Sequence, residues 1–306
     1  MLRGDRTILL VLMLLVTDSL AETGQGRVDE ADRLWWQAHE LIERARQRYQ
    51  DELEKRPATD GIGALDAPAV KADRDEAMRV LRDLLKRHPQ SPRCAEALYT
   101  IGQLQRASGA YDEMLGSLRD VIKRYPMSRE SDHALLTIGD YYFDQNRMAP
   151  AAKCYQKVIE HAARDLIGYA QYKLAWIEVN VGNYKQAMGL FERVARGSEP
   201  ARVSGYIMAD PPRVDLRCEA VRDLGFCYAE VGKPEAAVRY FGRFEMSSAL
   251  GIAVFEKLAN RYFIMERFPA ALIVYRHLLT LTTDAERQTE WRERVRWIED
   301  RLEKQK

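Results

Sequence analysis

The sequence has no excess of charge of either sign. Its 306 residues include 47 basic and 46 acidic ones, and the formal net charge at pH 7 is +1. Neither end of the chain carries a long run of like charges. This balance gives no electrostatic support for binding to nucleic acid, so we expect no nucleic-acid partner.

Cysteines and catalytic motifs are also scarce. The chain has four cysteines, and no two of them stand at the short spacing that is typical of a zinc site. Buried thiols are the favoured state, with one disulfide as the alternative. His39 and Glu40 begin a zinc-protease pattern that lacks its second histidine, and Gly61 and Gly63 lack the third glycine of a nucleotide-binding loop. We therefore expect no catalytic residues, no cofactor and no metal site, and hence no enzyme.

Long hydrophobic runs are absent beyond the first twenty residues. Thr7–Val16 is an apolar run that follows a basic start, and it is shorter than the roughly 20 residues that a membrane helix needs. Ser19-Leu20-Ala21 then offers small residues at cleavage-site positions. This order is typical of a secretory signal peptide over residues 1–21, with an uncleaved anchor as the alternative. We expect a periplasmic protein that begins at Glu22 and has no membrane span after cleavage.

One spacing recurs five times in the remaining sequence. A small residue is followed twelve positions later by a residue that is usually alanine, and a turn residue stands seven positions after the first. Two antiparallel helices approach closely only where side chains are small, so each pair predicts a helix crossing. The pairs are Gly102/Met114, Gly139/Ala151, Ala175/Ala187, Gly225/Ala237 and Ala259/Ala271, and the turn residues are Gly109, Asn146, Gly182, Gly232 and Glu266. Successive units lie 37, 36, 50 and 34 residues apart, which is the range of helical-hairpin arrays.

This pattern resembles the tetratricopeptide repeat (TPR) family. The resemblance implies an all-α fold, a right-handed superhelical solenoid of antiparallel helix hairpins with about twelve or thirteen main helices. We expect N-terminal helices and a degenerate first hairpin over 22–94, five hairpins over 95–283, and a capping helix over 284–306. The strings HPQSPRCAEALYTIG and YPMSRESDHALLTIG are similar to repeats of bacterial periplasmic envelope proteins of the Tol-Pal coordinator and outer-membrane assembly types. Later repeats are similar to those of deltaproteobacterial gliding machinery.

Three segments depart from the regular repeat. Arg56–Lys71 holds two prolines and two glycines, which predicts a loop. An insertion at about 197–216 lengthens the third period, and its apolar triplet Tyr206, Ile207 and Met208 is a candidate contact for a partner or a plug for a neighbouring hairpin. The C-terminal stripe of Trp291, Val295, Ile298 and Leu302 predicts a helix that covers the last hairpin.

The resemblance also implies that the first helices of the hairpins line a concave groove. Aromatic anchors beside polar groups suit the binding of an extended segment or a helix. Helical spacing places nine candidate contact residues on this face: Tyr99, Arg106, Phe143, Tyr172, Trp176, Asn180, Arg222, Phe226 and Phe263. The alternative for Tyr172 and Trp176 is that their rings pack in the core.

These patterns together predict a non-enzymatic scaffold for protein–protein interaction. Its partners would be other proteins of a cell-envelope complex, such as a surface-motility or envelope-assembly machine. The alternative is an accessory subunit of a peptidoglycan or polysaccharide enzyme system.

Overall fold

The computed structural model describes residues 29–56, 61–161, 164–197 and 216–304. The expected signal segment and the triplet Tyr206–Met208 lie outside these residues. Within the described ranges every regular element is a helix, and twelve helices have twelve or more residues. The prediction of an all-α array of helix hairpins is therefore confirmed. The contacts divide the chain into two compact units, with the boundary between Pro126 and Met127.

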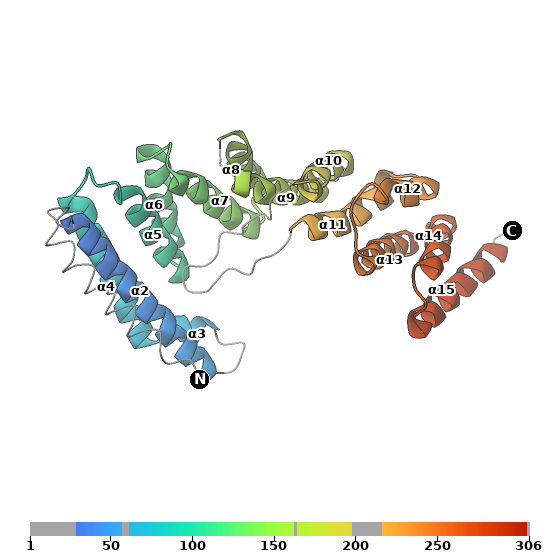
Figure 1. Cartoon of the computed structure of the whole chain (residues 1–306), viewed down its shortest axis with the longest axis horizontal. Helices are drawn as coiled ribbons and strands as arrows, with labels where there is room; N and C mark the ends of the chain where they lie inside the picture. The colour runs from blue at the N-terminus through green and yellow to red at the C-terminus, as the bar shows by residue number, and fades with distance from the viewer. Residues whose placement is uncertain (1–28, 57–60, 162–163, 198–215, 305–306) are drawn as a thin grey trace, which may run out of the picture. The chain divides into compact units, whose positions relative to one another are not determined.

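The described residues of the N-terminal unit form five helices, which are labelled in Figure 1. They are α2 (Glu30–Glu54), α3 (Gly61–Leu65), α4 (Pro68–Arg87), α5 (Cys94–Ala107) and α6 (Tyr111–Arg124). Consecutive long helices pack pairwise: α2 on α4, α4 on α5, and α5 on α6. Apolar side chains from α2, α4 and α5 form a shared core that includes Trp35, Leu81 and Ile101.

The expected loop at Arg56–Lys71 is wrong in its second half. Gly61–Leu65 forms the short helix α3, and α4 begins at Pro68. A proline is tolerated at the first helical position because the N–H that it lacks would have no partner within the helix. The buried Arg74 of α4 donates from Nη1 to the carbonyl oxygen of Leu65 at 3.3 Å. This hydrogen bond ties the end of α3 to α4.

The C-terminal unit contains the remaining hairpins and the last helix. Its elements are α7 (Arg129–Asp144), α8 (Met148–His161), α9 (Arg164–Asn180), α10 (Tyr184–Ala195), α11 (Leu216–Val231), the 3-10 turn η1 (Pro234–Ala236), α12 (Ala237–Phe241), α13 (Ser248–Ile264), α14 (Phe268–Leu281) and α15 (Ala285–Glu303). Within each of three hairpins the two helices pack together: α7 with α8, α9 with α10, and α13 with α14. Helix α15 packs on α14 and buries Trp291 and Ile298.

Four of the five predicted turn residues adopt the left-handed backbone conformation. Their φ angles are 73° at Gly109, 56° at Asn146, 79° at Gly182 and 55° at Glu266. Glycine reaches this region without steric cost, whereas side chains other than Asn and Asp rarely do. Gly232 serves a different purpose, because a Cβ atom there would lie 2.4 Å from the ring of Tyr228.

The small residues mark close approaches, although not always between the helices that we predicted. A Cβ atom at Gly102 would lie 2.7 Å from Leu118, and one at Gly139 would lie 2.9 Å from Tyr155, so both glycines face the second helix of their own hairpin. The predicted Gly225/Ala237 crossing is wrong. A Cβ atom at Gly225 would instead lie 3.1 Å from the carbonyl oxygen of Val254 in α13. The second helix of this hairpin is short, and α11 packs directly along α13.

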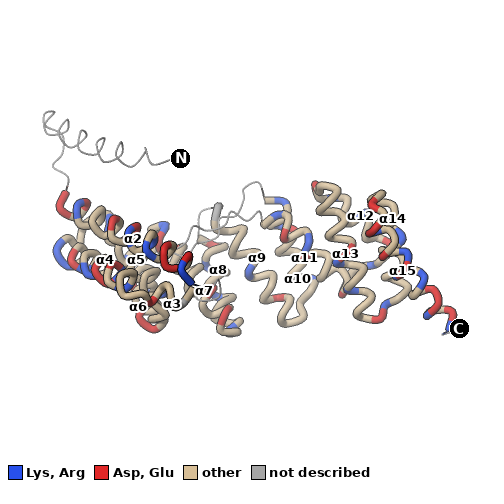
Figure 2. The backbone as a smooth tube through the Cα atoms, turned by 90° about the horizontal axis from the view of Figure 1, so that it is seen from below, with Lys and Arg blue, Asp and Glu red and all other residues tan. Residues whose placement is uncertain are grey.

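The state of the cysteines agrees only in part with the expectation from the sequence. Acidic and basic residues are interspersed along α2, α4 and α15 (Figure 2). Cys94 and Cys227 are buried as expected, but Cys218 is exposed, and no disulfide joins the four cysteines. Among the described helices, none is both long enough and apolar enough to cross a membrane.

Candidate partner-binding face

In the C-terminal unit, polar contacts join the first helices of successive hairpins. The first link is centred on Asp140 of α7, which is only 5% exposed. Its carboxylate accepts hydrogen bonds from the Tyr155 hydroxyl at 2.7 Å and from the Tyr169 hydroxyl of α9 at 2.9 Å. Lys173 Nζ of α9 lies 3.5 Å from Oδ1 and 4.6 Å from the ring centroid of Phe143. These donors compensate the burial of the carboxylate, which would otherwise be costly.

The second link joins three helices through Asp223 of α11, which is 4% exposed. Tyr172 of α9 donates its hydroxyl to Oδ2 at 2.8 Å, and Lys257 Nζ of α13 lies 2.5 Å from Oδ1. Burial, and secondarily the Asp223 charge, raises the pKa of the nearby Cys227 thiol to about 12. Burial likewise raises the pKa of Tyr172. Both groups therefore stay protonated near neutral pH.

The third link is the ion pair between Glu230 of α11 and Arg261 of α13. Arg261 donates to Oε1 from Nη2 at 2.5 Å and from Nε at 3.0 Å. Its guanidinium carbon also lies 4.3 Å from the ring centroid of Phe226. A cation at this distance from an aromatic face is attracted to it. The side chain thus holds α13 against α11 and fixes the ring of Phe226.

Tyr172, Trp176, Tyr184 and Phe226 form an aromatic cluster, which packs through Tyr172 and Trp176 against the fully buried ring of Phe191. Ring centroids lie 5.6 Å apart for Tyr172 and Phe191, and 5.8 Å apart for Trp176 and Phe191. Phe226 lies 6.4 Å from both Trp176 and Tyr184. All four rings of the cluster are half-buried. Core packing and surface exposure are therefore combined in Tyr172 and Trp176, and their part in binding stays a prediction.

The other predicted contact residues are distributed more widely. Tyr99 and Arg106 lie on α5 in the N-terminal unit, whereas the aromatic cluster belongs to the C-terminal unit. Arg222 pairs with Glu219 of its own helix at 2.6 Å. Asn180 is exposed at the end of α9, and its amide nitrogen lies 4.0 Å from Met148 Sδ.

Phe263 lies apart from the cluster, against the last helix. Its ring centroid is 5.2 Å from that of Trp297 in α15. The structure therefore brings together Tyr172, Trp176 and Phe226 among the nine candidates, and it places Phe263 in a second aromatic group.

The sequence prediction missed three of the charged residues that link the helices. They stand at one register of the repeat, two positions before the small residue of each first helix: Lys173, Asp223 and Lys257. A charged residue that recurs within an apolar stripe is a detectable signal, because an unpaired buried charge is costly and so indicates a partner nearby. Among the described residues, no group of His, Cys, Asp and Glu is arranged to hold a metal ion.

Comparison with solved structures finds similar helical-repeat proteins at low identity. MamA is 20% identical over 61% of this chain and 90% of its own, with a TM-score of 0.42. YrrB, described as a TPR protein with an unusual peptide-binding site, is 13% identical over 70% of this chain and 97% of its own, with a TM-score of 0.45. PilF of Pseudomonas aeruginosa is 12% identical over 84% of this chain and 98% of its own, with a TM-score of 0.42. At these scores the likenesses carry no argument about function.

Comparison with curated proteins finds no match. The model of the tetratricopeptide repeat, however, matches residues 71–129 and 136–201. These stretches span most of the helices from α4 to α10, including three of the predicted crossings with their turn residues. Residues 71–129 and 136–201 therefore consist of tetratricopeptide repeats, which form a scaffold of the kind that serves protein–protein interaction.

Proposed function

We propose that the chain is a non-enzymatic scaffold that holds protein partners of a bacterial cell-envelope complex in the periplasm. Its binding face is the surface of α7, α9, α11 and α13 that carries the three polar links, together with the aromatic cluster of α9, α10 and α11. The observation that supports this most is the half-buried state of all four rings of the cluster. Aromatic side chains that keep exposed area and are already held in place lose little entropy when a partner binds.

The charged residues of this face support a binding role over catalysis. Asp140, Asp223 and Glu230 are each engaged by a cationic side chain from the first helix of the next hairpin. A carboxylate held in this way keeps neighbouring helices at a fixed spacing. The face therefore offers a rigid surface on which aromatic rings alternate with paired charges, which suits a protein segment with both apolar and polar side chains.

Export is proposed from the N-terminal sequence. The apolar run Thr7–Val16 and the small residues up to Ala21 support a cleaved signal peptide. The similarity of the repeats to those of envelope-assembly and gliding proteins supports the choice of an envelope machine.

Affinity purification of the tagged chain from its own host, followed by mass spectrometry, tests this proposal. We expect envelope proteins to be recovered with the wild type and lost with Trp176→Ala/Phe226→Ala. Trp36→Ala is the matched control, because Trp36 is a half-exposed tryptophan of the N-terminal unit. Melting curves must show that all variants are folded.

The same preparation tests location. N-terminal sequencing should find Glu22 as the first residue in a periplasmic fraction. Recovery of cytoplasmic proteins alone, or retention of all partners by the folded double variant, would contradict the proposal. Recovery of peptidoglycan or polysaccharide enzymes would favour the alternative role as their accessory subunit.

A further inference from the structure

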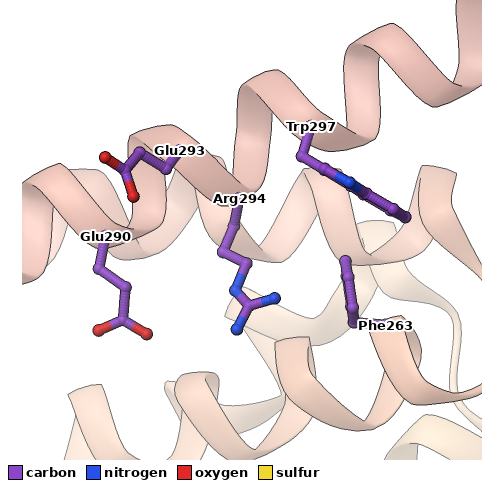
Figure 3. A pocket seen from close by; sticks show the side chains of 5 residues that line it. All are labelled: Phe263, Glu290, Glu293, Arg294 and Trp297. Carbon is purple, nitrogen blue, oxygen red and sulfur yellow. The ribbon is translucent and has the colours of Figure 1, made fainter.

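A second candidate site lies where the last helix meets α13. Five residues line a pocket of about 430 Å³: Phe263, Glu290, Glu293, Arg294 and Trp297 (Figure 3). The four residues of α15 follow the spacing i, i+3, i+4, i+7, so they share one face of the helix. This face differs from the one that buries Trp291 and Ile298.

The apolar wall of the pocket is a group of three aromatic rings. Phe263 and Trp297 lie 5.2 Å apart with their planes tilted by 52°, and the buried Phe268 lies 5.8 Å from Phe263 and 5.5 Å from Trp297. Trp297 nevertheless remains 48% exposed. An indole that is supported by neighbouring rings and open to solvent provides a preformed aromatic surface for a ligand.

The pocket contains more negative than positive side chains. Glu290 and Glu293 contribute two carboxylates, and neither forms an ion pair within the described residues. Arg294 contributes one guanidinium, whose carbon lies 5.1 Å from the ring centroid of Phe263. Figure 3 shows Glu290, Arg294 and Trp297 projecting from α15 on the side of Phe263. The pocket thus has a net negative charge, and one of its aromatic rings already lies beside a cation.

We propose that this pocket binds a lysine or arginine side chain of a partner protein. The apolar stem of that side chain lies against Trp297, and its charge lies between the carboxylates of Glu290 and Glu293. Attraction of a cation to aromatic faces and to carboxylates acts in the same direction here. A neutral or acidic side chain would cover the two carboxylates without pairing them, which is unfavourable. The inference extends the proposed protein-binding role with a site separate from the aromatic cluster.

Titration of the purified full chain with short peptides tests the pocket directly. The first peptide carries one arginine between alanines and glycines with both termini blocked, and the second carries the neutral isostere citrulline in its place. The chain has five tryptophans, so labelling with 5-fluorotryptophan gives a fluorine spectrum in which Trp297→Phe identifies the signal of Trp297. We expect the arginine peptide to shift this signal saturably. The citrulline peptide should bind about fivefold more weakly, as expected for the loss of a cation–aromatic contact and an ion pair.

Variants of α15 separate the possible causes of a shift. Glu290→Gln/Glu293→Gln should weaken binding of the arginine peptide about fivefold, whereas the exposed Glu303→Gln on the same helix should leave it unchanged. Arg294→Ala should strengthen binding about threefold, because it removes a competing cation from the ring of Phe263.

Loss of binding in Arg294→Ala, or equal binding of a glutamate peptide, would show an anion site and overturn the proposal. The absence of any shift at millimolar peptide would overturn it as well. These results do not depend on Trp176 or Phe226, so failure of the pocket and failure of the proposed function can be told apart.

Discussion

Replacement of Asp223 should reveal how strongly the buried links stabilise the C-terminal unit. Asp223→Ala removes the acceptor of the Tyr172 hydroxyl and the partner of Lys257 at once. A buried hydrogen bond to a charged group contributes about 1.5–3 kcal/mol. Lys257 is about one-third exposed and can regain water, so its share of the loss is small. We therefore expect the free energy of unfolding to fall by about 2–4 kcal/mol.

Asp223→Asn and Asp300→Asn calibrate this value. The Asp223→Asn variant would keep an acceptor for Tyr172 and lose only the ion pair, so we expect a loss of about 1–2 kcal/mol. Asp300 is exposed on α15, and its replacement should change stability by less than about 0.5 kcal/mol. Urea denaturation followed by far-UV circular dichroism and tryptophan fluorescence measures the three differences. If Asp223→Ala were as stable as Asp300→Asn, the link through Asp223 would not hold α9, α11 and α13 together.

Three further predictions concern other parts of the chain. Gly109→Ala should destabilise the N-terminal unit by about 1 kcal/mol, because Gly109 has a positive φ and open space around it. Gly116→Ala, in the exposed middle of α6, should instead stabilise the unit by up to about 1 kcal/mol. Equal effects of the two variants in urea titrations would contradict the role of φ. Trp291→Ala should lower the free energy of unfolding by about 3–5 kcal/mol, because its ring is buried against α14. Trp297→Ala on the same helix should lower it by less than about 1 kcal/mol. A reversed order in thermal unfolding would show that α15 packs by its other face. The exposed Cys218 should react with a thiol reagent at pH 8 in the native protein. Cys227 is buried and its pKa is raised to about 12, so it should react only on unfolding or as the pH approaches that value. Equal reaction rates of the two thiols in the native protein would show that α11 is not packed as described.

The local features of the fold were the ones that the sequence could predict. Gly109, Asn146 and Gly182 were found because a left-handed turn restricts the residue type at a single position. Helix α3 was missed because glycine and proline are common in loops, and composition does not show the support that Arg74 gives to this short helix. The true neighbour of Gly225 was missed because it depends on the short length of the following helix.

The candidate face was predictable in part for a similar reason. Helical spacing placed Tyr172, Trp176 and Phe226 on one surface, since all three follow from their position in the repeat. The partners of Asp223, however, lie 51 residues before it and 34 residues after it. Such distant pairs cannot be read from periodicity, which describes each helix separately.

The buried carboxylates also specify the order of the repeats. Lys173 of α9 meets an acid on the preceding hairpin, whereas Asp223 of α11 needs a hydroxyl from the hairpin before it and an ammonium group from the hairpin after it. In an array whose units contact only their neighbours, exchange of two hairpins would keep every apolar contact of the general pattern and still bury an unmatched charge. The hairpins of this unit are therefore not interchangeable modules. A chain with its hairpins in another order would be destabilised at the interfaces between hairpins, although each hairpin would keep its internal contacts.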